Sequence, residues 1–297
     1  TSLDISGFDT SNVKDMSQMF DHNHLESLDL SNFDTKQVTD MGAMFRECSS
    51  LKSLDLSNFI TNKVINMYSM FEDNSSLTSI DISSFDTSQV TDMSKMFFSC
   101  RTLTSLNLKH FNAQKVEDLN YIFGNCYFLT YLDLSGFNPQ EAVNLGHMFL
   151  YDNRLTSIDF SNFNTRSATD MTEMFGSCKE LKELDLKDFD TQQVTSMEAM
   201  FSDCTSLKSI NLSNFKTPKL NNLKYFLLAA RSITSINLSN FDTSKVTNMD
   251  NTFSSCQELR SLDLSNFNTQ NVLTMDFLFQ SCYKLTSLDI RNFDTRL

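Results

Sequence analysis

The sequence predicts an α/β fold, a right-handed solenoid with a parallel β-sheet on one face and short helices on the other. Three observations lead to this prediction. A Leu or Ile recurs every 26 residues from Leu25 to Leu285. Each repeat contains a short alternating pattern, followed by apolar residues three or four positions apart. The composition is that of one reiterated motif, since the 297 residues include 27 Phe and 15 Met but no Trp, 2 Pro and 6 Gly.

The period divides the whole chain into repeats. A partial unit covers residues 1–24, ten units of 26 residues cover 25–284, and a partial unit covers 285–297. No separate domain or linker fits, so we expect one repeat domain over 1–297. Neither end has a polar capping unit of the kind that closes other solenoids, so we expect a fragment of a longer chain. Columns are numbered by position in the unit, with Leu25 in column 1.

The first half of each unit predicts a strand. Columns 4 and 6 are apolar, as in Leu28 and Leu30, and a polar residue stands between them. This alternation is typical of a strand with one buried face, so we expect a short strand at about columns 3 to 7. A single unit cannot bury its apolar face alone. Neighbouring units therefore stack, and their strands run parallel at about 4.8 Å.

The second half of each unit predicts a short helix. Columns 14, 17, 20, 21 and 24 carry the residues Val38, Met41, Met44, Phe45 and Cys48. Their spacing of three or four positions is that of one helix face. Columns 17 and 20 hold all the methionines, and columns 9 and 21 hold most of the phenylalanines. We expect these columns to form the core.

The repeat resembles known bacterial sequences. The run C-x-x-L-x-x-L-D-L, present in full from Cys178 to Leu186, resembles the core of a leucine-rich repeat. Together with the preceding M-F-x-x-C it is similar to the repeat of BspA-like bacterial surface proteins, in the variant found in mycoplasmas and Gram-positive bacteria. The resemblance implies an extracellular protein of the bacterial cell surface that adheres to a host or neighbouring-cell protein or glycan. Any membrane or wall anchor would lie outside this chain.

Composition and motifs exclude other classes of function. The formal charge of −13 disfavours nucleic acid, which is held by Lys and Arg. No apolar run is long enough to span a membrane, and the first residues lack the regions of a signal peptide. The four histidines are scattered, and no catalytic motif occurs. We therefore expect no enzymatic activity, no cofactor and a monomeric chain.

The seven cysteines all occupy column 24, where other coils have Asn, Asp or Ala. A column with such exchanges is not a set of metal ligands. We expect buried thiols that bond the backbone of the turn. Disulfides between adjacent coils, such as Cys100 with Cys126, are the alternative, because the coil spacing falls within the Cα range of a disulfide. We expect their Cβ vectors to point the same way, which disfavours that bond.

Column 5 is Asp in most coils, and Ser is common in columns 3 and 7 beside it. We interpret it as a solvated acidic stripe whose repulsion the serine hydroxyls and water relieve. Weak calcium binding is an alternative that we do not expect, because the column lacks an enclosing loop. Paired catalytic carboxylates are disfavoured, since every acid in the column has the same environment.

Departures from the repeat indicate a candidate binding site. Tyr127, Phe128 and Tyr131 replace small or polar residues around one strand, Arg154 follows in the column of Phe128, and Lys109 breaks a Ser-Asn pair one coil earlier. Exposed aromatic residues beside a cation are typical of binding anchors. Ordinary variation of surface positions is the alternative. The corresponding alternative for function is a structural spacer that binds no ligand of its own.

Overall fold

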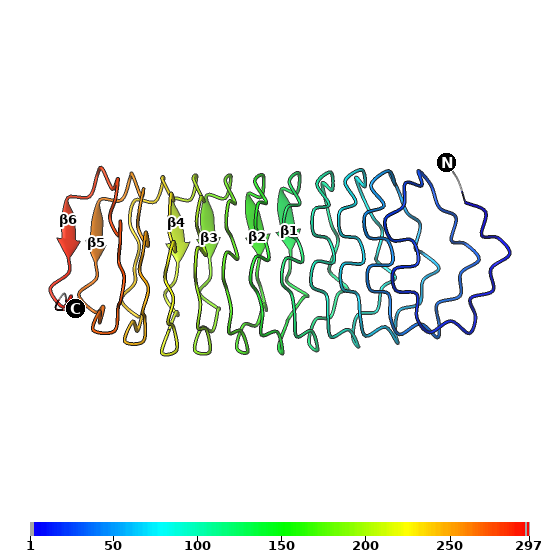
Figure 1. Ribbon diagram of the computed structural model, residues 1–297, viewed down its shortest axis with the longest axis horizontal. Helices are drawn as coiled ribbons and strands as arrows, with labels where there is room; N and C mark the ends of the chain where they lie inside the picture. Colours follow the sequence, from blue (N-terminus) through cyan, green and yellow to red (C-terminus); the bar gives the residue numbers. More distant parts are fainter. Residues whose placement is uncertain (1–2, 295, 297) are drawn as a thin grey trace. The chain divides into compact units, whose positions relative to one another are not determined.

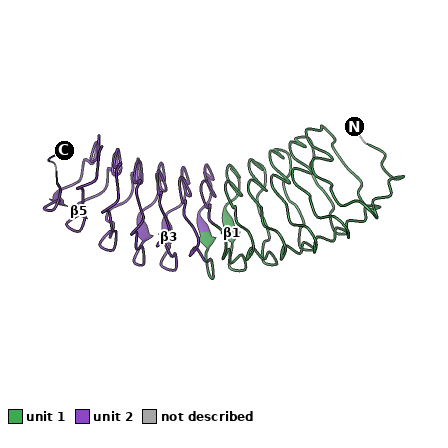
Figure 2. Ribbon diagram, turned by 60° about the horizontal axis from the view of Figure 1, so that its bottom comes forward, with its two compact units in different colours: residues 1–142, 158–163 green, residues 143–157, 164–297 purple. Residues whose placement is uncertain are grey.

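The computed structural model describes residues 3–294 and 296 of the chain. The chain forms two compact units, the first of Thr1–Ala142 with Ile158–Phe163 and the second of Val143–Ser157 with Asn164–Leu297. Within each unit, successive 26-residue coils lie side by side (Figures 1 and 2). The expectation of a single repeat domain over 1–297 stays a prediction.

Six strands of three residues occupy columns 3 to 5. They are β1 (Tyr131–Asp133), β2 (Ser157–Asp159), β3 (Glu183–Asp185), β4 (Ser209–Asn211), β5 (Ser261–Asp263) and β6 (Ser287–Asp289). The sheets are β1-β2, β3-β4 and β5-β6. Leu184 pairs with Ile210 and Leu262 with Leu288, in both cases in parallel. The parallel pairing of neighbouring coils is therefore confirmed for β3-β4 and β5-β6.

The strands are shorter than the sequence predicted. They begin at column 3, and among the described residues none forms in the coils of Leu28, Leu54 and Ile80. An Asx turn explains the length. The carboxylate in column 5 accepts the backbone N–H of column 7, as from Ser31 to Asp29 at 3.0 Å. This turn ends the extended segment after column 5, so each strand is only three residues long.

The predicted helices are wrong: no helix forms among the described residues. The segment is instead a run of turns, in which the N–H of Met44 bonds the carbonyl of Met41 at 3.2 Å and the N–H of Arg46 bonds Ala43 at 3.1 Å. The intervening N–H groups point to the next coil. Ala43, for example, bonds the carbonyl of Tyr68 at 2.6 Å.

The backbone dihedral angles explain why turns form here instead of a helix. The residues in columns 19 and 23 have a positive φ, as in Ala43 and Glu47 at 53° each. A right-handed helix requires a negative φ at every position, whereas a positive φ at the third residue is the mark of a type II turn. Met41, Met44 and Cys48 are nevertheless buried, as predicted. Two turns in series therefore direct the same columns inward as a helix would.

The predicted phenylalanine columns form the core of both units. In column 21, Phe45 and Phe71 stack with ring centroids 5.8 Å apart in the first unit, and Phe175 and Phe201 stack at 5.6 Å in the second. Each buried Phe contributes roughly 1.5 to 3 kcal/mol. One coil reverses the order of its residues, and there Phe226 contacts Phe201 edge-on at 5.2 Å.

The cysteine column is a ladder of thiols, as expected. Each thiol donates to the carbonyl in column 21 of the preceding coil, as from Cys100 to Phe71 and from Cys204 to Phe175, both at 3.0 Å. Asn74 fills the same column and donates to Phe45 at 2.8 Å. Burial raises the pKa of Cys100 and Cys204 to about 12. These are inert structural groups, because the reactive form of cysteine is the thiolate.

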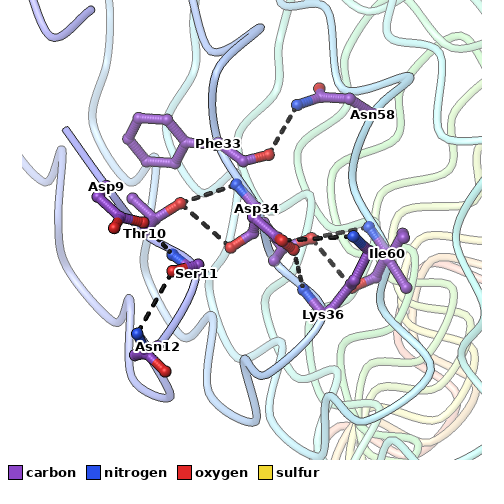
Figure 3. A network of polar contacts seen from close by, with 10 residues as sticks. Asp9, Thr10, Ser11, Asn12, Phe33, Asp34, Lys36, Asn58 and Ile60 are labelled. Carbon is purple, nitrogen blue, oxygen red and sulfur yellow. Dashed lines mark hydrogen bonds and ion pairs between the residues drawn. The ribbon is translucent and has the colours of Figure 1, made fainter. Parts of the chain in front are cut away.

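A second polar ladder, which the sequence analysis did not single out, consists of the buried threonines in column 11. The hydroxyl of Thr10 donates to the carbonyl of Asp34 at 3.1 Å and accepts the N–H of the same residue at 2.7 Å (Figure 3). Thr35 bonds Ile60 in the same way, at 3.0 Å and 2.7 Å. Each hydroxyl thus satisfies both backbone groups of a residue in the next coil.

Candidate functional site

The aromatic side chains that the sequence singled out lie at the surface of the first unit. The rings of Tyr127 and Phe128 meet edge-on with centroids 5.1 Å apart. Both residues are 39% exposed, and Tyr131 on β1 is 49% exposed. We call Tyr127, Phe128 and Tyr131 the aromatic patch. Their columns lie outside the buried set, so these side chains add little to the core and present apolar surface to solvent.

A backbone hydrogen bond and an ion pair fix residues of the aromatic patch and next to it. The N–H of Phe128 bonds the carbonyl of Arg101 at 3.3 Å. Nζ of Lys109 lies 3.7 Å from Oδ2 of Asp133, which is two residues from Tyr131 on β1. Desolvation and then the charges of Asp133 and Asp159 raise the pKa of the Tyr131 phenol, so it remains a neutral hydrogen-bonding group. Lys109 is therefore positioned beside the patch through an ion pair.

Arg154, the remaining residue of the predicted site, belongs to the second unit and is exposed there. Of the five predicted residues, Lys109 and the aromatic patch therefore belong to the first unit and Arg154 to the second. Whether these five residues bind a ligand stays a prediction.

A pocket of about 610 Å³ lies in the first unit, lined by His22, His24, Glu47, Ser49, Asp73, Ser75 and Arg101. We call it the turn pocket. Its residues come from columns 23 and 25 and their counterparts in the first coil, where the backbone leaves the run of turns. The turn before Leu25 is one residue shorter than the others, and this places His24 directly before column 1.

Ion pairs order the acidic end of the turn pocket. Nδ1 of His22 lies 2.7 Å from Asp21, and Nε2 lies 2.9 Å from Oε1 of Glu47. Arg46 binds the same Asp21 through Nε at 2.9 Å and Nη2 at 2.6 Å. The hydrogen bonds from Arg46 are the main reason that the pKa of Asp21 is lowered. The imidazole of His22 is thus held between two carboxylates.

Arg101 connects the turn pocket to the aromatic patch. With its amide oxygen assigned to the side that faces Arg101, Asn125 accepts hydrogen bonds from Nε and Nη2 of Arg101 at 3.2 Å and 3.3 Å. Tyr127 stands in the column of Arg101 one coil later. This pocket was not predicted, because the four histidines are scattered among unrelated columns of the repeat. The signal was present in column 25, where Arg101 and Tyr127 replace the serines of the two preceding coils.

A groove of about 730 Å³ lies on the strand face of the second unit, lined by residues of β2, β3 and β4 and by Thr156 and Lys182. Lys182 and Glu183 are charged residues of this lining. In the column of Glu183 the neighbouring coils have Ser157 and Ser209. The rest of its lining repeats the columns of neighbouring coils. It has no exposed aromatic residue, and we regard the turn pocket as the more specific site.

The carboxylates of column 5, which we expected to form only a solvated stripe, also stabilise the backbone turn that follows each of them. Its carboxylates accept backbone N–H groups two residues ahead, as from Ser57 to Asp55 and from Ser83 to Asp81, each at 3.0 Å. Hydrogen bonds from the backbone N–H and then the hydroxyl of Ser57 lower the pKa of Asp55, and those from the hydroxyl and then the N–H of Ser83 lower the pKa of Asp81. Among the residues that the structure describes, no group of three or more His, Cys, Asp and Glu is arranged to hold a metal ion. No described helix is long and apolar enough to cross a membrane.

The ladders and stacked coils define a repeat protein. The chain belongs to the family described as "Mycoplasma protein of unknown function, DUF285", which matches residues 1–80, 22–131, 52–157, 128–236 and 222–297. These matches together span the chain and confirm the resemblance to the mycoplasma variant of the bacterial surface-protein repeat.

Several solved structures are similar at low identity. A leucine-rich repeat protein from Bacteroides ovatus is 15% identical over 86% of this chain and 71% of that chain, with a TM-score of 0.39. One from Eubacterium ventriosum is 14% identical over 89% and 86%, with a TM-score of 0.37. A leucine-rich cell surface protein from Faecalibacterium prausnitzii is 16% identical over 85% and 76%, with a TM-score of 0.29. No curated protein matches this chain.

Proposed function

We propose that this chain is the binding module of a bacterial cell-surface protein, which adheres to a protein or glycan of a host or neighbouring cell. The exposed aromatic patch carries the proposal. It places three aromatic side chains, 39% to 49% exposed, in a molecule whose other phenylalanines are mostly buried in columns. Aromatic residues supply large contact area at low cost in conformational entropy, and they recur as anchors of binding sites.

The backbone suits adhesion. Each coil is bonded to the next by repeated backbone and side-chain ladders, so the surface around the patch is preformed and loses little entropy on binding. Many copies on one cell would then multiply weak contacts by avidity. The resemblance to BspA-like surface proteins supports an extracellular location. An acidic chain of net charge −13 fits a protein or neutral glycan partner better than nucleic acid.

The experiment removes the patch from the full chain. Beads coated with the chain, or with its Phe128→Ser and Tyr131→Ser double variant, are tested for adhesion to host cells and extracellular matrix. We expect the variant to lose most of the adhesion while its melting temperature changes little, because both side chains are partly exposed and Ser is common in both columns.

A matched control removes two exposed aromatic residues elsewhere. Tyr151→Ser and Tyr283→Ser lie in the second unit, at 50% and 76% exposure. Adhesion of this control should equal that of the unaltered chain. If the patch variant adheres as well as the unaltered chain, the patch is not a binding site and the alternative of a structural spacer gains.

A further inference from the structure

We propose that the turn pocket, together with Tyr127 in the next coil, binds a neutral oligosaccharide. This inference rests on the proposed function, because it names the ligand class of the same face of the first unit. The pocket volume of about 610 Å³ lies within the usual range of small-molecule sites. Its lining is polar and contains both acidic and basic side chains. This combination determines which class of ligand the pocket can bind.

The charges of the turn pocket disfavour ionic ligands. Oε1 of Glu47 already lies 2.9 Å from Nε2 of His22, so one of its oxygens has a partner before any ligand arrives. Arg101 stands on the same lining as Asp73. A cationic ligand would meet the guanidinium, and an anionic one would meet two carboxylates. Because each sign of charge meets a like charge at short range, an uncharged ligand is favoured.

The hydrogen-bonding groups match a ligand rich in hydroxyls. Arg101 offers planar donors, Asp73 and Glu47 offer acceptors, and Ser49 and Ser75 offer hydroxyls that do both. A sugar hydroxyl is also both donor and acceptor, so it is satisfied by neighbouring groups of the two kinds. Asn125 holds the guanidinium of Arg101 at 3.2 Å, which reduces the entropy lost when the ligand binds.

The aromatic neighbour supplies the apolar part of the site. Sugar rings have C–H faces as well as hydroxyl edges, and aromatic rings present a large apolar surface. Tyr127 follows Arg101 by one coil in the same column, and the N–H of Phe128 bonds the carbonyl of Arg101 at 3.3 Å. Successive coils lie about 4.8 Å apart, so from His22 to Tyr127 the site spans roughly 19 Å. That length suits a chain of several sugars.

Calorimetric titration of the full chain tests the proposal with four neutral probes: chitotetraose, maltotetraose, mannotetraose and lacto-N-neotetraose. An α2,8-linked sialic acid tetramer and a Gly-Lys peptide of eight residues serve as charged comparators. We expect at least one neutral probe to bind more tightly than either charged one. Arg101→Ser and Asp73→Asn should each weaken that binding by about tenfold, the loss of one charge-assisted hydrogen bond to the ligand.

Matched controls exist in the second unit. Arg231 stands in the column of Arg101 and makes the same local bond, from its N–H to Ala229 at 2.8 Å. Asp203 stands in the column of Asp73, and both have φ of 57°. Arg231→Ser and Asp203→Asn should leave the affinity unchanged. Equal losses in these controls would show that the effect is not local to the turn pocket.

Two results would overturn the proposal: no neutral probe binds, or the charged peptide binds best and Asp73→Asn abolishes its binding. These outcomes leave the adhesion experiment unaffected. If the aromatic patch variant loses adhesion while no neutral probe binds, the surface is adhesive and its ligand is a protein. If neutral probes bind but the patch variant adheres normally, the sugar site is real and adhesion lies elsewhere.

Discussion

At Gly136 the chain passes close to the backbone of the preceding coil. This residue occupies column 8, where Asn58 instead donates to the carbonyls of Leu30 and Phe33 at 3.0 Å each. A Cβ added at Gly136 would lie 2.9 Å from the carbonyl oxygen of Lys109. A backbone atom cannot move aside as a side chain can. The column therefore tolerates a larger residue in one coil and excludes it in another.

Gly136→Ala should lower the free energy of unfolding by about 1 to 3 kcal/mol, because the coil must shift to relieve the contact. Gly7→Ala is the matched control. It lies in the same column of the first coil, and nothing comes within 4 Å of its added Cβ. Urea denaturation of the full chain compares the two. Equal stability of the two variants would contradict the close approach at Gly136.

Sequence patterns predicted which residues face inward, but not the backbone that directs them there. Met41 and Phe45 are buried as the three-or-four spacing required. That spacing does not distinguish a helix turn from two linked β-turns, because both place the same columns on one side. The residues with positive φ include Lys95, Glu173 and Ala199, and none is glycine. The usual sign of a left-handed position was therefore missing from the sequence.

The candidate site was predicted in part. Tyr127, Phe128 and Tyr131 departed from their columns, and the structure places them at the surface. The turn pocket depends on residues from four coils and on a turn one residue short, and its outline comes only from three-dimensional stacking. Arg101 departs from the serines of its column, but its bond to Asn125 could not be foreseen.

The threonine ladder joins neighbouring coils through both backbone groups of one residue. Thr61 is 1% exposed, and its hydroxyl bonds the carbonyl and the N–H of Asp86 at 2.9 Å and 2.8 Å. Ala113 interrupts the ladder, and its own N–H bonds the carbonyl of Phe137 at 3.1 Å. Where the hydroxyl is missing, the N–H of column 11 instead bonds a carbonyl of the next coil, one residue before the usual partner.

Thr61→Val keeps the shape of the side chain but leaves both backbone groups of Asp86 without their partner. We expect it to lower the free energy of unfolding by about 1 to 3 kcal/mol. Thr91→Val is the control, because Thr91 is exposed and bonds Ile65 at 3.2 Å, where water replaces the lost bond. Chemical denaturation monitored by circular dichroism measures both variants. A cost for Thr91→Val as large as that for Thr61→Val would contradict the role of burial.

Acidic side chains make the stability of the whole molecule depend on pH. In column 5 the pKa of Asp29 is lowered chiefly by the backbone N–H of Ser31, and Asp55 and Asp81 have equivalent bonds. A carboxyl whose pKa is lower in the folded state stabilises the fold above its unfolded pKa of about 4, and this contribution is lost as the pH falls through the folded pKa. The charge of the chain also turns positive in this range.

The free energy of unfolding should therefore decrease between about pH 5 and pH 2. A triple variant, Asp29→Asn, Asp55→Asn and Asp81→Asn, keeps acceptors in this column, as Asn211 does for the N–H of Ser213 at 3.2 Å. We expect it to be less stable than the unaltered chain at pH 7 and to lose less stability between pH 7 and pH 3. Urea denaturation at several pH values measures the free energy of unfolding of both proteins. Parallel curves for the two proteins would show that these carboxylates do not contribute.

The run of turns gives each unit an electrical polarity along its stack of coils. The N–H groups of Met41, Ala43, Phe45 and Glu47 all point to carbonyls of the following coil, and those of Met171, Glu173, Phe175 and Ser177 do the same in the second unit. Peptide dipoles that align head to tail add, as they do along a helix axis. In each unit the run of turns thus contributes a dipole along the stack of coils, with its negative pole at the first coil and its positive pole at the last.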